Sequence, residues 1–304
     1  LESPDLSDIE ITEISTESKS LSPSEKQDLS DIWQKGKRKM IIVGLMPPNP
    51  EINKQLFLLS KNDQVLVLSE SCSNINNDLG IQCIDRMLGS FDHDARELQP
   101  DVLVSIGGPI ISKKIKKYFS KNKPNFHICV NQTTAQNTYN ALTHYIACDA
   151  VKVLDVFLNI ESKNEVKLSA LVRYKLAENQ IKHQLFFQNC AFSDLKVFHF
   201  LLSSLKEKTH LHLSNSTVVR YVQLFQQNKQ FTYYANRGVS GIDGSTSTAL
   251  GFASHNKEDN VLITGDMAFF YDSNAFWHKH IPQNIKIILI NNQGGGIFRI
   301  IDGP

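Results

Sequence analysis

Short runs of apolar, mostly β-branched residues recur along the chain, and polar stretches long enough for a helix separate them. Four such runs lie in the first half, at residues 40–43, 65–68, 102–106 and 127–130. Four more follow at residues 211–214, 232–235, 261–264 and 285–290. Continuous apolar strands with crossover helices between them are typical of parallel sheets that are covered on both faces. The pattern therefore predicts an α/β fold with two doubly wound parallel-sheet domains.

The polar stretches carry helix signals of their own. Ser22 and Glu25 have the spacing of a capping box, Pro23 suits the first helical position, and Gly36 would end that helix. Ser193 would cap a later helix whose apolar residues form one stripe, running to about residue 208. Further helices are predicted at residues 113–120, 160–184, 216–226, 245–254 and 273–279.

These elements divide the chain into three parts. We assign residues 1–21, which are acidic and polar, to a linker. Residues 22–180 form a predicted central Rossmann-like domain, and residues 181–304 form a second α/β domain. Because the chain stops shortly after the fourth strand of the second series, we expect this second domain to be C-terminally incomplete.

Composition and charge narrow the possible functions. Hydrophobic residues make up 41% of the 304 residues, which is enough for a sizeable core. The 32 Lys and Arg residues balance 31 Asp and Glu residues to a net charge of +1, so no general attraction to nucleic acid or membranes is expected. No apolar run approaches the roughly 18–20 residues that cross a bilayer. The five cysteines fit no zinc motif and indicate free thiols in a reducing cytoplasm.

Two strands of the second series end in small turns that carry oxygen ligands. One leads into Gly265-Asp266, and the other leads into Asn291-Asn292 and the run Gly294-Gly295-Gly296. Ligands collect at the carboxyl ends of parallel strands, so both turns would face one site if their strands are close in the sheet. Carboxylate and amide oxygens suit Mg²⁺, and Gly265 would let the backbone approach a diphosphate. Gly-Asp alone is more often a helix cap, and the second turn is what favours a cofactor site.

This pattern resembles the GDG…NN motif of thiamin-diphosphate enzymes. Three longer strings, at residues 236–251, 265–274 and 291–298, resemble the MenD family, the menaquinone-pathway synthases of 2-succinyl-5-enolpyruvyl-6-hydroxy-3-cyclohexene-1-carboxylate (SEPHCHC). The resemblance is dense over about 211–304 and looser over 22–180. It implies thiamin diphosphate and Mg²⁺, or Mn²⁺, as cofactors.

By matching position, the resemblance assigns cofactor and metal contacts in the second domain. Asp266, the Asn292 side chain and the Gly294 carbonyl resemble the metal ligands. Ile242 resembles the apolar wedge that holds the cofactor bent, although an ordinary core isoleucine would be the favoured interpretation without the motif. The other residues implied to contact the cofactor are Ser240, Gly241, Gly265, Met267, Ala268, Gly295 and Ile297. Met267 replaces the last glycine of the general motif, and a hydrophobic residue is usual there in this family.

The resemblance also implies substrate contacts. Ser216, Arg220 and Arg237 resemble residues that bind substrate carboxylates, and Ile297 with Phe298 resembles the apolar wall beside the reacting carbon. Lys113 and Lys114 resemble a basic pair that the central domain directs at the active site. For that pair, a solvated helix face is an equally good interpretation, because the matching stretch is short.

The implied activity is decarboxylation of 2-oxoglutarate followed by 1,4-addition of the resulting succinyl-semialdehyde carbanion to isochorismate. The family works as a homodimer or homotetramer and uses a glutamate from an N-terminal pyrimidine-binding domain. That domain has no counterpart before residue 22, so we expect the 304 residues to form a half-site with little activity alone.

Two alternatives stay open: another thiamin-diphosphate 2-oxoacid decarboxylase or carboligase, and a non-catalytic nucleotide-binding module. The absence of a GxGxxG turn argues against the second.

Overall fold

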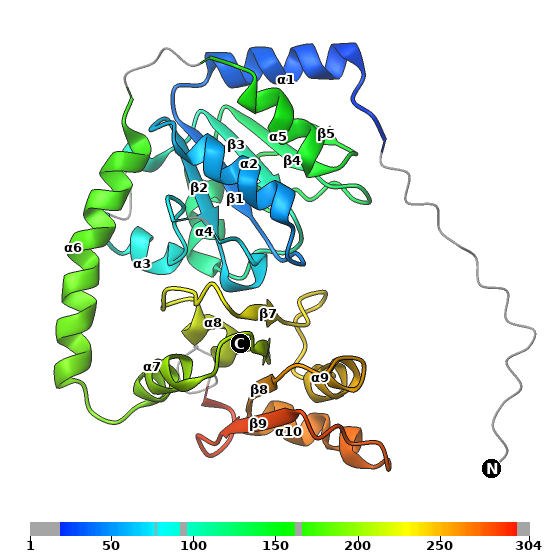
Figure 1. The fold of residues 1–304 in the computed structure, drawn as a ribbon. Helices are drawn as coiled ribbons and strands as arrows, with labels where there is room; N and C mark the ends of the chain where they lie inside the picture. Colours follow the sequence, from blue (N-terminus) through cyan, green and yellow to red (C-terminus); the bar gives the residue numbers. More distant parts are fainter. Residues whose placement is uncertain (1–18, 77, 92–95, 162–165, 297–304) are drawn as a thin grey trace, which may run out of the picture.

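The structure is a computed structural model that describes residues 19–76, 78–91, 96–161 and 166–296. Most of the predicted linker, residues 1–18, and the predicted contacts Ile297 and Phe298 lie outside this range. Two parallel sheets organise the described residues, as Figure 1 shows. This confirms the predicted α/β fold with two parallel-sheet domains.

The first sheet has five parallel strands in the order β2-β1-β3-β4-β5. Strands β1, β2 and β3 are buried along nearly their whole length, so their side chains must pack on both faces. In β1, Ile41 and Val43 belong to one core cluster, whereas Met40 and Ile42 belong to another. The strands are β1 Lys39–Val43, β2 Val65–Ser69, β3 Val102–Ile106, β4 Phe126–Val130 and β5 His144–Ile146.

Helices cover both faces of this sheet. One face is covered by α1 Pro23–Lys35, α2 Pro50–Ser60 and α5 Ala150–Leu158, and the other by α3 Ile84–Leu88, α4 Lys113–Lys121 and α6 Leu168–Asn189. The predicted capping box is present: the Glu25 N–H donates to Ser22 Oγ at 3.2 Å, and the Ser22 N–H donates to a Glu25 carboxylate oxygen at 2.8 Å. The short strand β5 and the helix α5 were not predicted individually. Strand β5 has only three residues and a polar start, so it lacks the apolar run that marks the other strands.

The second sheet has four parallel strands in the order β7-β6-β8-β9. Its core packs against α7 and α8 on one face, and α9 lies on the other, where Phe252 contacts His212. The elements are α7 Asp194–Ser204, β6 His210–Leu213, α8 Thr217–Val222, β7 Thr232–Tyr234, α9 Ser245–Ser254, β8 Asn260–Gly265, α10 Asp266–Tyr271 and β9 Ile285–Ile290.

Several predicted helices are shorter or placed differently than expected. The helix from Ser193 ends at Ser204, and Ser193 makes no side-chain cap hydrogen bond. The segment predicted at 216–226 is helical only over Thr217–Val222, and the one at 273–279 is a 3₁₀ turn over Ser273–Phe276. Helix α6 begins later than predicted and runs further, and Figure 1 shows it passing along one side from the first sheet toward the second. No helix in the described ranges is both long and apolar enough to cross a membrane.

The two sheets meet through the segment that follows β2. This segment contains the 3₁₀ turn η1 Ser71–Ser73, and Figure 1 places it at the edge that faces β7 and α8. The Asn74 amide donates to the Tyr233 carbonyl at 3.1 Å and accepts from the Tyr233 N–H at 2.8 Å. Cys72 and Ile111, both from the first sheet's carboxyl edge, are buried in the core of the second. The relative position of the sheets is therefore fixed by polar and apolar contacts together.

Candidate functional site

The turns after β8 and β9 come together as predicted. The two strands are paired in parallel register through Gly265 and Ile290, so the residues that follow both strands leave the sheet at the same edge. Asp266 is buried, and one of its carboxylate oxygens accepts the Gly294 N–H at 2.6 Å. Its other oxygen accepts the Met267 N–H at 2.8 Å. Each carboxylate oxygen has a further lone pair that could bind a cation.

The side chain of Asn292 has a buried oxygen atom that could act as a metal ligand. Its Oδ1 atom is buried and makes no hydrogen bond to the described part of the chain. A buried acceptor of this kind costs about 1–3 kcal/mol unless something else satisfies it. The three residues after Asn292, which are Gln293, Gly294 and Gly295, all have positive φ angles, so the backbone turns sharply there. The residues present therefore fit a divalent cation.

The possible metal ligands at the turns after β8 and β9 are oxygen atoms, and most of them are neutral. In the ranges that the structure covers, no three His, Cys, Asp or Glu side chains gather at a possible metal site. A cation at this turn would thus depend on amide and carbonyl oxygens in addition to Asp266. A Cβ atom added to Gly265 or Gly294 would meet nothing within 4 Å, so open space adjoins both turns. That space is where a diphosphate could approach the backbone.

The loop between β7 and α9 contains the predicted wedge. Ile242 is half-buried and does not belong to the sheet's core cluster, so the interpretation as an ordinary core isoleucine is wrong. Ser240 has a positive φ of 62° and is exposed. The Asn215 side chain holds the loop, because its Nδ2 donates to the Asn236 carbonyl at 2.7 Å and to the Gly241 carbonyl at 2.6 Å.

The predicted arginines lie near this loop. An Arg220 guanidinium nitrogen donates to the Ser216 carbonyl at 2.6 Å, and Ser216 itself has the unusual φ of 71° at the start of α8. Arg237 is 7% exposed and donates to Asn215 Oδ1 at 2.6 Å. Burial lowers the pKa of Arg237, and the nearby positive charge of Arg220 lowers it further. Arg220 and Arg237 are therefore close enough for their charges to interact, and Ser216 is joined to Arg220 through its backbone carbonyl.

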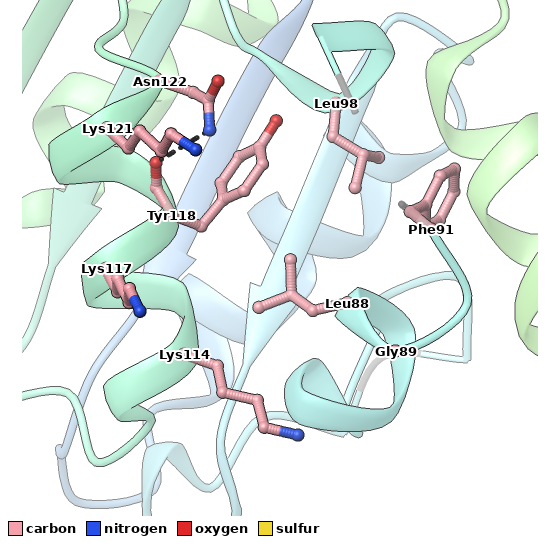
Figure 2. Close-up of a pocket in the computed structure, with 9 residues that line it drawn as sticks. All are labelled: Leu88, Gly89, Phe91, Leu98, Lys114, Lys117, Tyr118, Lys121 and Asn122. Atoms are coloured by element: carbon pink, nitrogen blue, oxygen red, sulfur yellow. Dashed lines mark hydrogen bonds between the residues drawn. The ribbon is translucent and has the colours of Figure 1, made fainter. Parts of the chain in front are cut away.

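The two predicted lysines lie in the first turn of α4. Lys113 and Lys114 are both exposed at the start of α4. Lys114 lines a pocket of about 360 Å³ with Lys117, Lys121 and apolar residues, and Figure 2 shows it reaching toward Leu88 and Gly89. Burial lowers the pKa of another lysine of α4, Lys116, and the charges of Arg237 and Arg220 lower it further.

Two further residues of the site were not predicted. Asn215 links Arg237 to the loop at residues 236–241. Glu70 is 1% exposed at the end of β2, and its two carboxylate oxygens accept the N–H groups of Ile111 at 2.6 Å and Ser112 at 2.7 Å. Both could have been suspected because each lies just after a strand, Glu70 after β2 and Asn215 after β6.

Known proteins similar to this chain identify its family. Residues 12–213 match a family described as "Middle domain of thiamine pyrophosphate". The chain therefore belongs to the thiamine-pyrophosphate enzymes. Within that class it belongs with the MenD family, since its curated relatives carry the name 2-succinyl-5-enolpyruvyl-6-hydroxy-3-cyclohexene-1-carboxylate synthase.

The relatives are similar over almost the whole chain. The synthase of Flavobacterium johnsoniae is 40% identical over 285 residues, which cover 91% of this chain and 50% of that protein. Those of Christiangramia forsetii and Porphyromonas gingivalis are both 36% identical and cover 93% and 92% of this chain. The chain spans about half the length of the curated relatives it matches.

Proposed function

We propose that this chain contributes the diphosphate-, metal- and anion-binding part of a SEPHCHC synthase. The observation that carries the proposal is the hydrogen bond from the Gly294 N–H to Asp266, beside an Asn292 Oδ1 atom that has no partner among the described residues. The names of the relatives support the choice of reaction. In this proposal the substrates are 2-oxoglutarate and isochorismate, and the whole enzyme is a homodimer or homotetramer of the cytoplasm.

In the proposed site, Asp266, Asn292 and the Gly294 carbonyl bind Mg²⁺ or Mn²⁺. The open space beside Gly265 and Gly294 admits the diphosphate, with Met267, Ala268 and Gly295 around it. Ser240 and Gly241 present Ile242 to the cofactor as the apolar wedge. Bound thiamin diphosphate would supply the electron sink that lets a 2-oxoacid lose CO₂ and form a new carbon–carbon bond.

Arg220 and Arg237 supply the substrate half of the proposal. Both proposed substrates are dicarboxylates, whereas the chain as a whole carries a net charge of only +1. Arg220 and Arg237 therefore provide a local positive field, with the Ser216 hydroxyl as a neutral partner, and arginine can hold a carboxylate through two parallel hydrogen bonds. Burial of Arg237 strengthens this attraction, because a less polar surrounding screens the charge less.

Calorimetric titration tests the cofactor part of the proposal. Thiamin diphosphate and Mg²⁺ would be titrated together into the wild type, Asp266→Asn and the matched control Asp28→Asn, an exposed aspartate on α1. We expect at least about tenfold weaker binding for Asp266→Asn, since a charge-assisted contact contributes about 1.5–3 kcal/mol. Asp28→Asn should bind like the wild type. Equal affinity for all three proteins would refute the assignment of the metal turn.

A further inference from the structure

The side chain of Asn215 makes three hydrogen bonds with the loop that follows β7. Its Nδ2 atom donates to the carbonyl oxygens of Asn236 at 2.7 Å and Gly241 at 2.6 Å, and its Oδ1 atom accepts from an Arg237 guanidinium nitrogen at 2.6 Å. Both N–H groups of the amide are therefore used, together with its oxygen. Asn215 is 2% exposed, so little solvent reaches these hydrogen bonds.

The two carbonyl groups that Asn215 contacts each precede a residue of the proposed site. The Asn236 carbonyl belongs to the peptide group that leads into Arg237, and the Gly241 carbonyl belongs to the one that leads into Ile242. Because a peptide group is planar, a hydrogen bond to its oxygen fixes the plane from which the next residue departs. A single side chain thus orients the backbone before the arginine and before the proposed wedge.

Asn215 is itself anchored to the second sheet. It lies two residues after β6, and the residue between, Ser214, is buried and donates its N–H to the Ile263 carbonyl of β8 at 3.0 Å. The middle of the loop, residues 238–240, is exposed. Asn215 therefore connects a rigid strand end to a loop whose middle has few contacts with the rest of the domain.

The guanidinium of Arg237 is held at one nitrogen and left free at another. It donates from Nη1 to Asn215, whereas its Nε atom is buried with no hydrogen-bond partner in the described residues. A buried guanidinium N–H without an acceptor is costly, and a carboxylate oxygen is the acceptor that best satisfies it. The contact with Asn215 thus fixes the direction of this arginine and leaves an N–H for an anion.

We infer that Asn215 is a positioning residue for both halves of the proposed site: it presents Ile242 to the cofactor and keeps Arg237 directed at the substrate carboxylate. This inference rests on the proposed function and adds the residue that joins its two halves. Asparagine suits both roles, because its amide donates to carbonyl groups and accepts from an arginine. Aspartate could still accept from Arg237, but it would turn a negative oxygen atom toward the Asn236 and Gly241 carbonyls. The two roles can therefore be separated by substitution.

Trypsin cleavage after Arg237 measures how firmly Asn215 holds this arginine. Arg237 is 7% exposed, but residues 238–240 are exposed, so a released Arg237 becomes accessible to the protease. We expect Asn215→Ala to be cleaved there at least about tenfold faster than the wild type, because the loop loses three hydrogen bonds. Mass spectrometry of the fragments identifies the cleaved bond and gives its rate.

The matched control is Asn284→Ala, at the amino end of β9 in the same sheet. The Asn284 amide also donates to a set of backbone carbonyls, those of Ala253, Asn256 and Glu258. This variant therefore removes a similar set of hydrogen bonds away from the proposed site. Its cleavage after Arg237 should stay within about twofold of the wild-type rate.

Titration of thiamin diphosphate with Mg²⁺ tests the second role of Asn215. We expect Asn215→Ala and Asn215→Asp to bind at least about tenfold more weakly than the wild type, since both lose the contact that precedes Ile242. Asn284→Ala should bind like the wild type. Asn215→Asp should nevertheless be cleaved slowly after Arg237, because its carboxylate still holds the arginine. A general loss of stability would change cleavage and cofactor affinity together, so this difference between the two variants identifies positioning.

The outcomes separate this inference from the proposed function. If Asn215→Ala is cleaved after Arg237 at the wild-type rate, or no faster than Asn284→Ala, the inference is wrong and the proposed function stands. Rapid cleavage of Asn215→Asp would count against it in the same way. If the wild type binds no cofactor, the proposed function fails, and the cleavage rates still decide whether Asn215 holds Arg237. Should Asn215→Ala not fold, Asn215→Asp carries the test, and cofactor affinity equal to that of the wild type would overturn the inference.

Discussion

Replacement of Glu70 by glutamine should change how the stability of the first sheet depends on pH. Glu70 is 1% exposed, and both of its oxygens accept backbone N–H groups at the start of α4. Glutamine keeps the size of the side chain but has only one acceptor oxygen, so one N–H loses its partner. That loss costs about 1–3 kcal/mol of unfolding free energy.

The pH dependence follows from the pKa of Glu70. Burial raises this pKa from 4.5 to about 7, against the opposing effect of the two backbone N–H donors; Asp85 raises it further, and Lys116 lowers it. Because the folded pKa is raised, the carboxyl contributes stability that is fully present below pH 4.5 and is lost as the pH rises through about 7. The whole change corresponds to about 3 kcal/mol, at 1.36 kcal/mol for each tenfold change in proton affinity.

The expected result is a pH-dependent difference between two proteins. At pH 5 the Glu70→Gln variant should be less stable than the wild type by about 1–3 kcal/mol. Between pH 5 and 8 the wild type should lose about 2–3 kcal/mol relative to the variant, so the difference should shrink or reverse sign. Titrating groups that do not interact with Glu70 are common to both proteins and cancel in this comparison.

Urea unfolding, followed by the fluorescence of Trp33, measures this difference. Trp33 is buried against Phe157 in the first sheet's domain, and Trp277 is 84% exposed in the second. Both proteins would therefore carry Trp277→Phe, so that the signal reports the first domain alone. A difference in unfolding free energy that stays constant from pH 5 to pH 8 would refute the reasoning.

Three other substitutions probe packing and the junction. Gly44→Ala should destabilise the chain by about 3 kcal/mol or more in thermal melts, because its Cβ would lie 1.9 Å from the Gly108 carbonyl oxygen. Gly251→Ala, in an open position of α9, should instead stabilise it by about 0.5–1 kcal/mol, and a loss of stability there would contradict this. Asn74→Ala removes both hydrogen bonds to the Tyr233 backbone and should cost about 2 kcal/mol in urea unfolding.

The parts of the molecule that the sequence predicted share a local signal. The strands were predicted because they are continuous apolar runs, and the metal turn because Asp266 and Asn292 each follow such a run. Parallel pairing of β8 with β9 then brings the two turns to one edge. The pairing itself has no such local signal, since strand order cannot be read from one sequence.

The missed residues depend on contacts that are distant in sequence. Glu70 contacts Ile111 and Ser112, which lie about forty residues further along the chain. Four lysines within five positions at the start of α4 give no local hint of which one is half-buried. Tertiary packing decides that Lys116 is half-buried while Lys113, Lys114 and Lys117 are exposed.

The turn at Asp266 and the two arginines, Arg220 and Arg237, depend on different parts of the fold. The turn at Asp266 needs only β8 and β9, which are neighbours in one sheet and hold it by direct pairing. Arg220 and Arg237 are close enough to Lys116 and Glu70 of the first sheet's half for their charges to interact, so their surroundings depend on the junction that Asn74 and Ile111 maintain. Under the proposed function, cofactor binding should therefore be insensitive to small shifts between the sheets, whereas recognition of the anionic substrate should be sensitive to them.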